Sequence, residues 1–475
     1  MVFMAQNFSL RYPLISWHGK VGNQQGDPAA AYRYTEARLS PIGELMLEDI
    51  DKDTVDMVDN YDNTTKEPIV LGGYFPNAIV NPAMGIAVGI ATTFAPHYLK
   101  DVINASCLMI HNMIQDKDTD IEDLIKIVKA PDFPTGGTII NGNDMPSVYR
   151  TGKGKVILRA KYRIEQKKNT KQIVFYELPY KINYTSMMEE LAKLADAIPD
   201  IKDVRDESSK EIKIVVELKR DADPNWIIRQ IFKKTDLQSN YNCNCVAIDE
   251  HGKPKENINL KDMIFSYITR AAKTYYRSML YERKQHETRL FRIKALLFAS
   301  EHIDEITYIL KNETDPVAVL MSKLSINEEM ARIIYDMKLS SISRVSNLSL
   351  QDEEKKLNNR VSELSELLSD QKKFLKALKA KLSSIPKLKY FKNDVRRTDI
   401  DNVDLNIDDR SLVKDQQVVI TYTNHDIIKS VLASDYTTTK GTSKGVSTKL
   451  KEDEIILDML TMSTKDDLFC FTNTG

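Results

Sequence analysis

The longest stretch without a helix breaker sets the main constraint on how this chain can fold. Residues 260–310 contain neither proline nor glycine (LKDMIFSYITRAAKTYYRSMLYERKQHETRLFRIKALLFASEHIDEITYIL). Proline breaks a helix interior and glycine weakens it, so this run predicts a helix. Its first part is longer than the roughly three to four turns of an ordinary globular helix.

A second helical run follows, with apolar residues at heptad spacing. Steps of 4, 3, 4, 7, 3 and 4 residues separate Leu357, Val361, Leu364, Leu368, Leu375, Leu378 and Leu382. Gln371 stands where the stripe skips a position. Two long helices that flank a compact segment (about 300–345) predict an antiparallel coiled-coil arm with a small helical tip. A plain helical bundle fits the same spacing.

The rest of the sequence mixes helix and strand patterns, which indicates a multidomain α+β protein. Helical spacing joins Ile42, Leu45, Met46 and Ile50, and residues 186–198 read as a further helix. Strand patterns occupy 153–164, 171–180, 211–220, 416–430 and 466–475. An acidic, polar stretch after Arg397 predicts a linker before the last strands.

Composition narrows the functional classes. The 475 residues are too many for one core and suggest about three or four folding units. A formal net charge of -1 means that any nucleic-acid binding must come from local basic patches. Four cysteines do not make a disulfide framework in so long a chain. No signal-peptide pattern opens the sequence, and the longest apolar stretch (79–91) is too short to cross a bilayer, so we expect a cytoplasmic protein without a membrane partner.

A Tyr-Arg-Tyr triplet follows a Gly-Asp-Pro turn and an alanine-rich, helix-favouring run at residues 29–31. Tyrosine is a poor nucleophile at neutral pH because its ordinary pKa is about 10. A neighbouring cation would stabilise both the phenolate and a phosphate under attack. Adjacent residues on a helix do not share a face, so the sequence alone leaves open whether Arg33 and Tyr34 meet or only pack.

The segment around this triplet resembles the nucleophile segment of the bacterial type IIA DNA topoisomerases, as found in the breakage-reunion chain of gyrase and its topoisomerase IV counterpart. The pattern is met in WHGKVGNQQGDPAAAYRYTEARLS (17–40), with Lys20 as one departure. Further matches follow in the same order along the chain: NYDNTTKEP (60–68), FPNAIVN (75–81), GIAVGIAT (85–92), PDFPTGG (131–137), YRTGKGKVILRAK (149–161), ELPY (177–180), RDES (205–208), ELKRDA (217–222), TDLQ (235–238) and RRT (396–398).

The resemblance implies a division into five parts. They are the C-terminal part of a winged-helix DNA-cleavage domain (1–78), an α/β tower domain (79–260), a coiled coil with a helical dimerisation gate (261–395, tip about 300–345), a linker (396–411) and the beginning of a β-propeller-like domain (412–475). The apolar surface of the gate would come from Met330, Ile333, Ile334, Met337 and Leu339.

The resemblance also implies roles for single residues. Tyr34 matches the nucleophile that attacks a DNA phosphodiester and forms a 5′-phosphotyrosyl link, and Arg33 matches the arginine that supports the phosphate. Ile86 matches a wedge that enters the base stack and bends DNA, although the residue alone reads as a buried strand residue. DNA phosphate contacts are expected of Arg150, Lys153, Lys155 and Arg159, for which a solvated strand face is an equal alternative.

Cofactors and partners are implied in the same way. The family's catalytic Mg²⁺ and its ATP are held by the partner B subunit, in an A2B2 assembly on double-stranded DNA, with dimerisation of the two DNA-cleaving chains through the gate. An upstream His-containing segment with a further arginine precedes the match in the family, so we expect it to be missing here or supplied by another chain. Residues 437–447 keep Lys440, Gly441, Lys444 and Gly445 of a gyrase-type box but lack its paired arginines, so the gyrase and topoisomerase IV branches are not separated.

Two functions from different classes follow from these expectations. The first is the DNA-cleaving and religating subunit of an ATP-dependent type IIA topoisomerase, which passes one duplex through a transient break in another. The second is a DNA-bending or scaffolding homologue that keeps the fold and does not cleave. The intact Arg33-Tyr34 pair argues for catalysis, and the late start of the match argues for caution.

Overall fold

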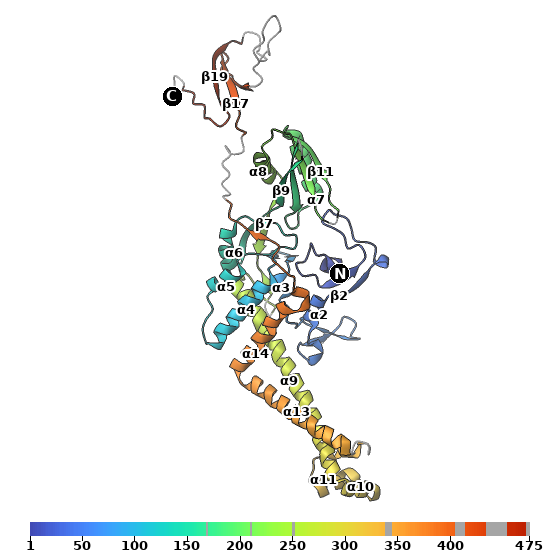
Figure 1. Ribbon diagram of the computed structural model, residues 1–475. Helices are drawn as coiled ribbons and strands as arrows, with labels where there is room; N and C mark the ends of the chain where they lie inside the picture. The colour runs from blue at the N-terminus through green and yellow to red at the C-terminus, as the bar shows by residue number, and fades with distance from the viewer. Residues whose placement is uncertain are drawn as a thin grey trace. The chain divides into compact units, whose positions relative to one another are not determined.

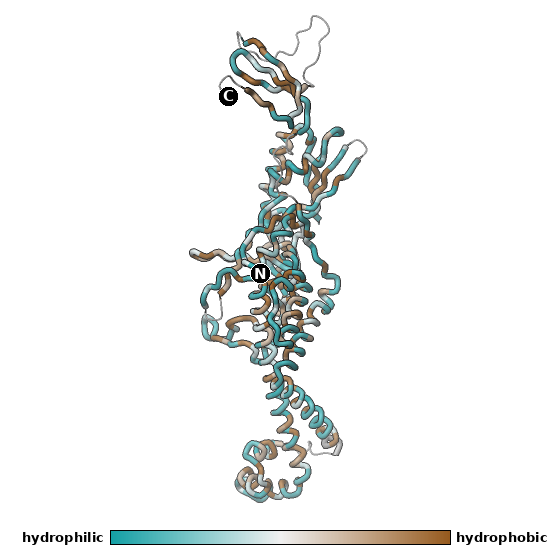
Figure 2. Tube along the Cα trace, turned by 90° about the vertical axis from the view of Figure 1, so that its left-hand side faces the viewer, coloured by the Kyte–Doolittle hydropathy of each residue, from teal (hydrophilic) through white to brown (hydrophobic). Residues whose placement is uncertain are grey.

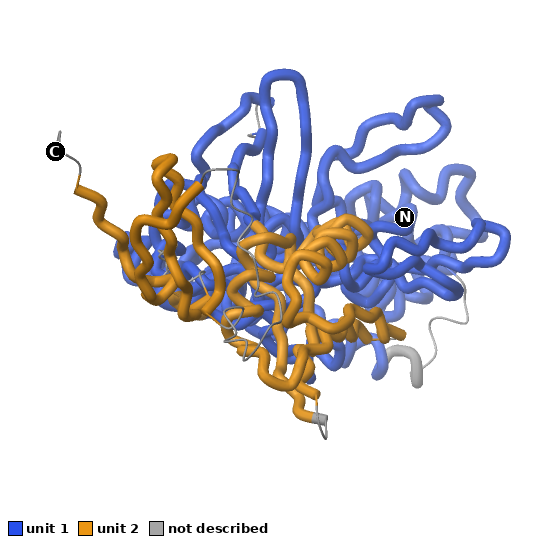
Figure 3. Tube along the Cα trace, turned by 90° about the horizontal axis from the view of Figure 1, so that it is seen from above, with its two compact units in different colours: residues 1–157, 240–400 blue, residues 158–239, 401–475 orange. Residues whose placement is uncertain are grey.

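The computed structural model describes residues 1–167, 170–209, 211–248, 252–337, 344–403, 414–433 and 454–471 (Figure 1). It is a mixed α/β structure with one very long helix and several sheets, and none of the sheets closes into a barrel within the described residues. Two compact units divide the chain, as Figure 3 shows: residues 1–157 with 240–400, and residues 158–239 with 401–475. The division into five parts stays a prediction.

The first unit begins with short elements that carry long loops. They are α1 (Val2–Ala5), β1 (Ile15–His18), β2 (Glu36–Leu39), α2 (Pro41–Leu47), β3 (Met57–Asp59), β4 (Lys66–Pro68) and α3 (Asn77–Val80). Each of the pairs β1–β2 and β3–β4 is an antiparallel two-stranded ribbon. The predicted helix through Ile50 is shorter than expected, because α2 ends at Leu47 and the chain turns through Asp49 at a φ of 64°.

A six-stranded sheet lies at the centre of this unit, in the order β16-β7-β8-β13-β6-β5. Its strands are β5 (Ala83–Ala87), β6 (Ile90–Phe94), β7 (Thr138–Ile139), β8 (Lys153–Arg159), β13 (Gln238–Asn244) and β16 (Asp399–Ile400). The chain passes to the second unit within β8 and returns within β13. The hairpin β5–β6 forms one edge of the sheet, and the adjoining β14 (Ala247–Ile248) and β15 (Pro254–Lys255) make a separate ribbon.

Helices with apolar faces complete the core of the first unit. These are α4 (Leu99–Ile114), α5 (Ile121–Val128) and α6 (Met145–Thr151). Leu99, Val102 and Ile110 of α4 are almost fully buried, which fits their helical spacing of three or four residues and multiples of it. Leu124 and Val128 of α5 are buried in the same way.

The long run forms α9 (Leu260–Glu301), a helix of 42 residues, and the leucine stripe is shared by α13 (Arg344–Ser369) and α14 (Gln371–Ser384). Ion pairs join Arg289 to Glu353 and Glu282 to Arg360, so the residue number rises along α13 as it falls along α9. The two helices are therefore antiparallel. The stripe is divided at Asp370, whose carboxylate accepts hydrogen bonds from the backbone N–H groups of residues 372 and 373 and so starts α14.

Three short helices close the far end of α9: α10 (Ile303–Asn312), α11 (Pro316–Leu324) and α12 (Glu328–Tyr335). They share a small core with α9 that includes Ala299, Ile306 and Leu320. Of the residues expected to supply apolar surface there, Ile334 is instead fully buried in this core, and Met330, Ile333 and Met337 pack against it half-buried. Leu339 lies outside the described residues.

The second unit contains a four-stranded antiparallel sheet of order β11-β12-β10-β9. Its elements are β9 (Lys161–Lys167), β10 (Thr170–Glu177), α7 (Tyr184–Ala197), β11 (Ile201–Asp206), β12 (Ile214–Leu218) and α8 (Pro224–Lys234). Ile173, Phe175 and Val216 of the sheet pack with Met187 and Ile231 of the two helices. The strands and the helix expected here from sequence are present, although the strand expected over 153–164 is interrupted at Ala160.

The same unit holds a three-stranded antiparallel sheet of order β18-β17-β19, made of β17 (Gln417–Thr423), β18 (Ile428–Leu432) and β19 (Ile456–Ser463). The hairpin expected over 416–430 is confirmed. The strand expected over 466–475 is wrong for its described part, because residues 466–471 form a turn and an extended tail. Figure 2 shows hydrophobic stretches near the C-terminal label, and Leu457 of β19 and Phe469 and Phe471 of the tail are exposed. Residues 437–447, with the box-like glycines and lysines, lie outside the described residues.

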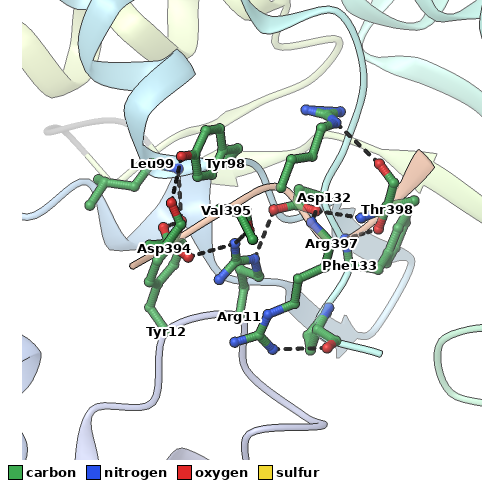
Figure 4. Close-up of polar contacts among 12 residues, drawn as sticks. Arg11, Tyr12, Tyr98, Leu99, Asp132, Phe133, Asp394, Val395, Arg397 and Thr398 are labelled. Carbon is green, nitrogen blue, oxygen red and sulfur yellow. Dashed lines mark hydrogen bonds and ion pairs between the residues drawn. The ribbon is translucent and has the colours of Figure 1, made fainter. Parts of the chain in front are cut away.

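A buried ionic cluster ties three distant segments of the first unit together (Figure 4). Arg11 Nε donates to Asp132 at 2.8 Å and Arg11 Nη2 donates to Asp394 at 2.8 Å, while Arg11 and Asp132 are almost fully buried. The second oxygen of the Asp132 carboxylate accepts hydrogen bonds from the backbone N–H groups of Arg397 and Thr398. The cluster therefore joins the N-terminal segment, the loop after α5 and the chain that follows α14.

We expect Arg11→Met to lower the stability of the first unit by about 3–5 kcal/mol, because it leaves the buried Asp132 carboxylate without its ionic partner. Thermal unfolding of the whole chain measures this as a fall in the lowest-temperature transition. The matched control is Arg150→Met, which breaks an exposed ion pair with Glu122 and should change the transition far less. Equal effects of the two substitutions would contradict a special role for the cluster.

Candidate functional site

The Tyr-Arg-Tyr triplet lies at the end of a long loop (residues 19–35) that is closed by a two-stranded ribbon. β1 and β2 pair from Ile15 with Leu39 to His18 with Glu36. Gly19 has a φ of 106°, and a Cβ there would lie 3.1 Å from the carbonyl oxygen of Tyr34. Glycine is therefore required where the two ends of the loop approach each other.

Polar contacts inside the loop give it a defined shape. The Asp27 carboxylate accepts from Lys20 Nζ at 3.0 Å and from Asn23 Nδ2 at 3.1 Å, and Asn23 Oδ1 accepts from the backbone N–H of Asp27 at 2.9 Å. Gln6 Nε2 donates to the carbonyl oxygen of Val21 at 3.0 Å, which fixes the loop to the chain after α1. These contacts hold the part of the loop that precedes the triplet in a defined conformation.

Arg33 and Tyr34 are neighbours in space as well as in sequence. The guanidinium carbon of Arg33 lies 4.8 Å from the centroid of the Tyr34 ring. The Tyr34 side chain is 68% exposed, and Tyr32 is 88% exposed. A packing role in the core is therefore excluded for both tyrosines. A cation close to an exposed phenol can stabilise negative charge that develops there, which is compatible with nucleophilic attack on a phosphate.

The helix suggested by the alanine run does not form. Only residues Tyr32–Tyr34 make a single turn of 3₁₀ helix, and Glu36 already belongs to β2. Without an α-helix, the rule that adjacent residues point to different faces does not apply. This difference explains how Arg33 can reach the Tyr34 ring.

Ile86 lies on the exposed hairpin β5–β6 and is 91% exposed, so its interpretation as a buried strand residue is wrong. Val88 at the turn is fully exposed, and Met84 is 54% exposed. Gly89 forms the turn at a φ of 78°. An apolar projection of this kind loses contact with water only when a partner covers it, and the step between two base pairs is one such partner.

The basic residues divide into two kinds of environment. Arg150 makes a bidentate ion pair with Glu122 at 2.6 and 2.9 Å, and Lys153 lies 3.8 Å from Glu256. Arg159 packs 4.5 Å from the Phe232 ring and hydrogen-bonds Gln238, and burial lowers its pKa. Lys155 is exposed on β8. Direct phosphate contact is thus best suited to Lys155, while the others would first have to leave their present partners.

Sequence reasoning missed two buried polar residues beside the hairpin. The Asn81 side chain, 3% exposed, bonds both backbone polar groups of Tyr12. His97 Nδ1 lies 2.8 Å from the carbonyl oxygen of Ile79, so Nδ1 carries the proton and Nε2 accepts from the Tyr149 hydroxyl at 3.0 Å. Asn81 falls in the quoted motif FPNAIVN and His97 follows it closely, but their partners are distant in sequence.

The described residues hold neither a membrane span nor a metal-binding group. No helix among them is long and apolar enough to cross a bilayer. No group of three or more His, Cys, Asp or Glu side chains among them is arranged to hold a metal ion. Cys243 and Cys245 are free and buried, and burial raises the pKa of each thiol to about 12.

Comparison with known proteins gives a consistent result. Residues 1–383 match the family described as the A subunit of DNA gyrase/topoisomerase IV. The chain is 38% identical over 485 residues to the DNA gyrase A subunit of Streptococcus pneumoniae serotype 4, with 100% of this chain and 58% of the relative covered. It is 36% identical over 484 residues to the DNA gyrase A subunit of Thermotoga maritima, with 100% of this chain and 59% of the relative covered.

The buried His97 gives a prediction for the pH dependence of stability. Burial lowers its pKa to about 4 from an ordinary value of 6.5. As the pH falls through 6.5, the unfolded chain takes up a proton that the folded chain does not, so this group destabilises the fold progressively between about pH 6.5 and 4. We expect His97→Asn to show a smaller fall in melting temperature from about pH 7 to pH 5 than the parent protein. The matched control is His111→Asn, which makes the same replacement at an exposed position.

Proposed function

Since the chain belongs to the family of DNA gyrase and topoisomerase IV A subunits, we propose that it is the DNA-breaking and rejoining subunit of an ATP-dependent type IIA topoisomerase. The chain spans about 58% of the length of the curated relatives it matches. The observation that carries the proposal is the exposed Tyr34 phenol with the Arg33 guanidinium beside its ring, on a loop whose base is braced.

Tyr34 is the proposed nucleophile. Its Oη attacks a DNA phosphorus, the O–P bond to the 3′-oxygen breaks, and that oxygen leaves with a proton as a 3′-hydroxyl. The product is a 5′-phosphotyrosyl link, which conserves one phosphodiester bond, so the reverse attack by the 3′-hydroxyl reseals the strand without an external energy source. The exposure of Tyr34 allows a rigid duplex to reach it.

Arg33 is the proposed electrostatic partner in that step. Negative charge develops on the phosphate oxygens during attack, and a guanidinium can donate two hydrogen bonds to them. The same cation stabilises the tyrosine oxygen while it loses its proton. Its guanidinium carbon lies 4.8 Å from the centre of the Tyr34 ring, which supports a role close to that side chain.

The β5–β6 hairpin is the proposed DNA-bending element. Ile86 would enter a base step and unstack it, at a cost of about a few kcal/mol that the added protein–DNA contact offsets. Lys155, and with it Lys153, Arg150 and Arg159, would contact phosphates of the bent duplex. The chain's formal charge of -1 gives no general attraction to DNA, so such local contacts have to provide it.

The assembly is proposed from the family alone. A partner B subunit would bind ATP and hold the catalytic Mg²⁺, and two copies of the present chain would dimerise through the helical tip around α12 to give an A2B2 complex in the cytoplasm. The winged-helix, tower and propeller-like names for the expected parts belong to the same proposal. The antiparallel α9 and α13 with their closed tip support the dimerisation element, because they form a separate projection with its own core.

The second function, DNA bending without cleavage, rests on one observation. The exposed apolar hairpin would bend DNA whether or not Tyr34 reacts. Cleavage and bending are separable steps, so one experiment can distinguish the two functions.

We expect Tyr34→Phe to abolish covalent capture of DNA while DNA binding is retained, because only the nucleophilic oxygen is lost. The chain is incubated with an end-labelled duplex, Mg²⁺ and a bacterial gyrase B subunit, and detergent then stops the reaction. A parallel sample carries the upstream His-containing segment as an N-terminal fusion. Label that migrates with the parent protein and is absent from the mutant establishes Tyr34 as the nucleophile.

Tyr32→Phe is the matched control, since it removes a neighbouring exposed hydroxyl and should leave covalent capture unchanged. Label that persists in Tyr34→Phe would overturn the assignment. DNA that is bound and bent by the parent protein without any label, in both samples, would instead select the scaffolding function.

We expect Ile86→Ala to reduce DNA bending and to lower covalent capture by about tenfold, equivalent to ~1.4 kcal/mol. The change in fluorescence energy transfer between dyes at the ends of a short duplex measures the bend. Ile69→Ala is the control, because Ile69 is also exposed but lies outside the hairpin. Equal bending by the two mutants would contradict a wedge role for Ile86.

A further inference from the structure

The chain segments that lead to Tyr34 and to Ile86 meet at one buried side chain, Asn81. Asn81 Oδ1 accepts from the backbone N–H of Tyr12 at 2.7 Å, and Asn81 Nδ2 donates to the carbonyl oxygen of Tyr12 at 2.9 Å. The amide thus pairs with one residue's backbone as a neighbouring β-strand would. Nδ2 also donates to Asn77 Oδ1 at 2.9 Å, which sets the orientation of the amide.

From Tyr12 the chain continues into the nucleophile loop, which is the loop of residues 19–35 that carries Tyr34. The carbonyl oxygen of Pro13 accepts from Ser40 Oγ at 2.8 Å, and the backbone N–H of Ser40 donates to Leu14 at 3.0 Å. β1 starts at Ile15 and pairs along its length with β2, which follows Tyr34 by two residues. A displacement of Tyr12 is therefore carried to the loop through paired strands.

From Asn81 the chain continues into the wedge hairpin, which is the β5–β6 hairpin that carries Ile86. Asn81 is followed by Pro82, and β5 begins at Ala83. Proline fixes its own φ and has no backbone N–H, so the step from Asn81 to the strand has little freedom. Ala83 pairs with Phe94, and the carbonyl oxygen of Phe94 accepts from the Tyr241 hydroxyl at 2.9 Å.

Tyr12 itself is firmly held. Its hydroxyl donates to Asp394 at 2.8 Å and accepts from the backbone N–H of Leu99 at 2.9 Å, and its ring packs edge-on against Phe75 and Phe391. Because Tyr12 is held in place, the hydrogen bonds of Asn81 to it fix the position at which the hairpin begins.

We propose that Asn81 is a positioning residue that sets the distance between the wedge hairpin and the nucleophile loop, so that the bend in the DNA and the phosphate to be cut stay in register. The inference rests on the proposed function for its meaning, but the positioning itself is a property of the protein without DNA. Misplacement of a reacting group by about 1 Å can cost on the order of a hundredfold in rate.

The first test measures the distance directly. Spin labels are attached to Tyr32→Cys and Val88→Cys, at two exposed positions, in a background with Cys107 and Cys470 changed to serine. Cys243 and Cys245 can stay, because they are buried. We expect a narrow distance distribution in this parent and a broader one after Asn81→Ala, with labelled protein diluted in unlabelled protein.

Two further variants keep the test valid if Asn81→Ala does not fold. Asn77→Ala removes the oxygen that orients the Asn81 amide and should broaden the distribution less, while Asn77→Asp retains that oxygen and should restore the parental width. Asn141→Ala is the matched control: Asn141 makes the same two-point backbone contact, with Lys155 and Ile157, away from both loops. An unchanged width in folded Asn81→Ala overturns the inference, and if Asn81→Ala does not fold, an unchanged width in Asn77→Ala overturns it.

The second test asks what the distance does. For Asn81→Ala we expect the amount of covalent complex per bent DNA to fall by about tenfold or more, and the cut sites to scatter along the duplex. A role in stability alone would lower bending and cleavage in proportion. If the parent protein captures no DNA, the proposed function fails while the distance measurement still decides the inference. If the parent captures DNA and the ratio is unchanged in Asn81→Ala, the inference fails alone.

Discussion

The buried carboxylate of Asp132 is the contact on which the architecture of the first unit depends. One carboxylate oxygen accepts a hydrogen bond from the charged Arg11 side chain. The other oxygen accepts hydrogen bonds from two backbone N–H groups of the chain after α14. A buried carboxylate without partners would be strongly unfavourable, so all three segments must be in place together. Arg396 and Thr398 add bonds to the carbonyl oxygens of Ala130 and Gly136, which extends the same junction. The sequence stretches PDFPTGG and RRT, more than 250 residues apart, are therefore two halves of one structural element.

This junction also explains why two exposed loops can be held in a defined relation. Arg11 and Tyr12 are adjacent, so the residue that completes the ionic cluster precedes the residue that contacts Asn81. The loop of residues 19–35 and the β5–β6 hairpin carry exposed side chains, and they begin within about seven residues of Tyr12 and Asn81, which contact each other. Rigid support beneath exposed reactive groups is what catalysis by positioning requires.

Sequence patterns predicted the helices and strands that depend on neighbouring residues. They failed where contacts between residues distant in sequence determine the structure. The glycine-free run and the leucine stripe predicted α9 and α13 because helix periodicity is local. The break at Asp370 was not expected, since it depends on a side-chain cap rather than on the stripe.

The alanine run before Tyr34 favours a helix by propensity, but its glycine turns and paired strands leave room for one 3₁₀ turn only. Ile86 is apolar, as core residues are, and it is exposed only because the hairpin lies at the edge of the sheet. Tyr34 and Arg33 are proposed as site residues from a family pattern and stay a prediction, whereas Asn81 and His97 have partners that no spacing reveals.

The length of α9 has a mechanical consequence. At about 1.5 Å per residue, its 42 residues are about 60 Å long, and contacts up to Glu282 bind its N-terminal half to the rest of the first unit. The returning chain is bound to α9 by antiparallel ion pairs, so we expect α9 and α13 to move together. A rotation of about 10° at Glu282 would move the far end of α9, about 30 Å away, by about 5 Å. A small rotation at the contact between α9 and the first unit is therefore amplified along the helix into a displacement of several ångströms at its far end.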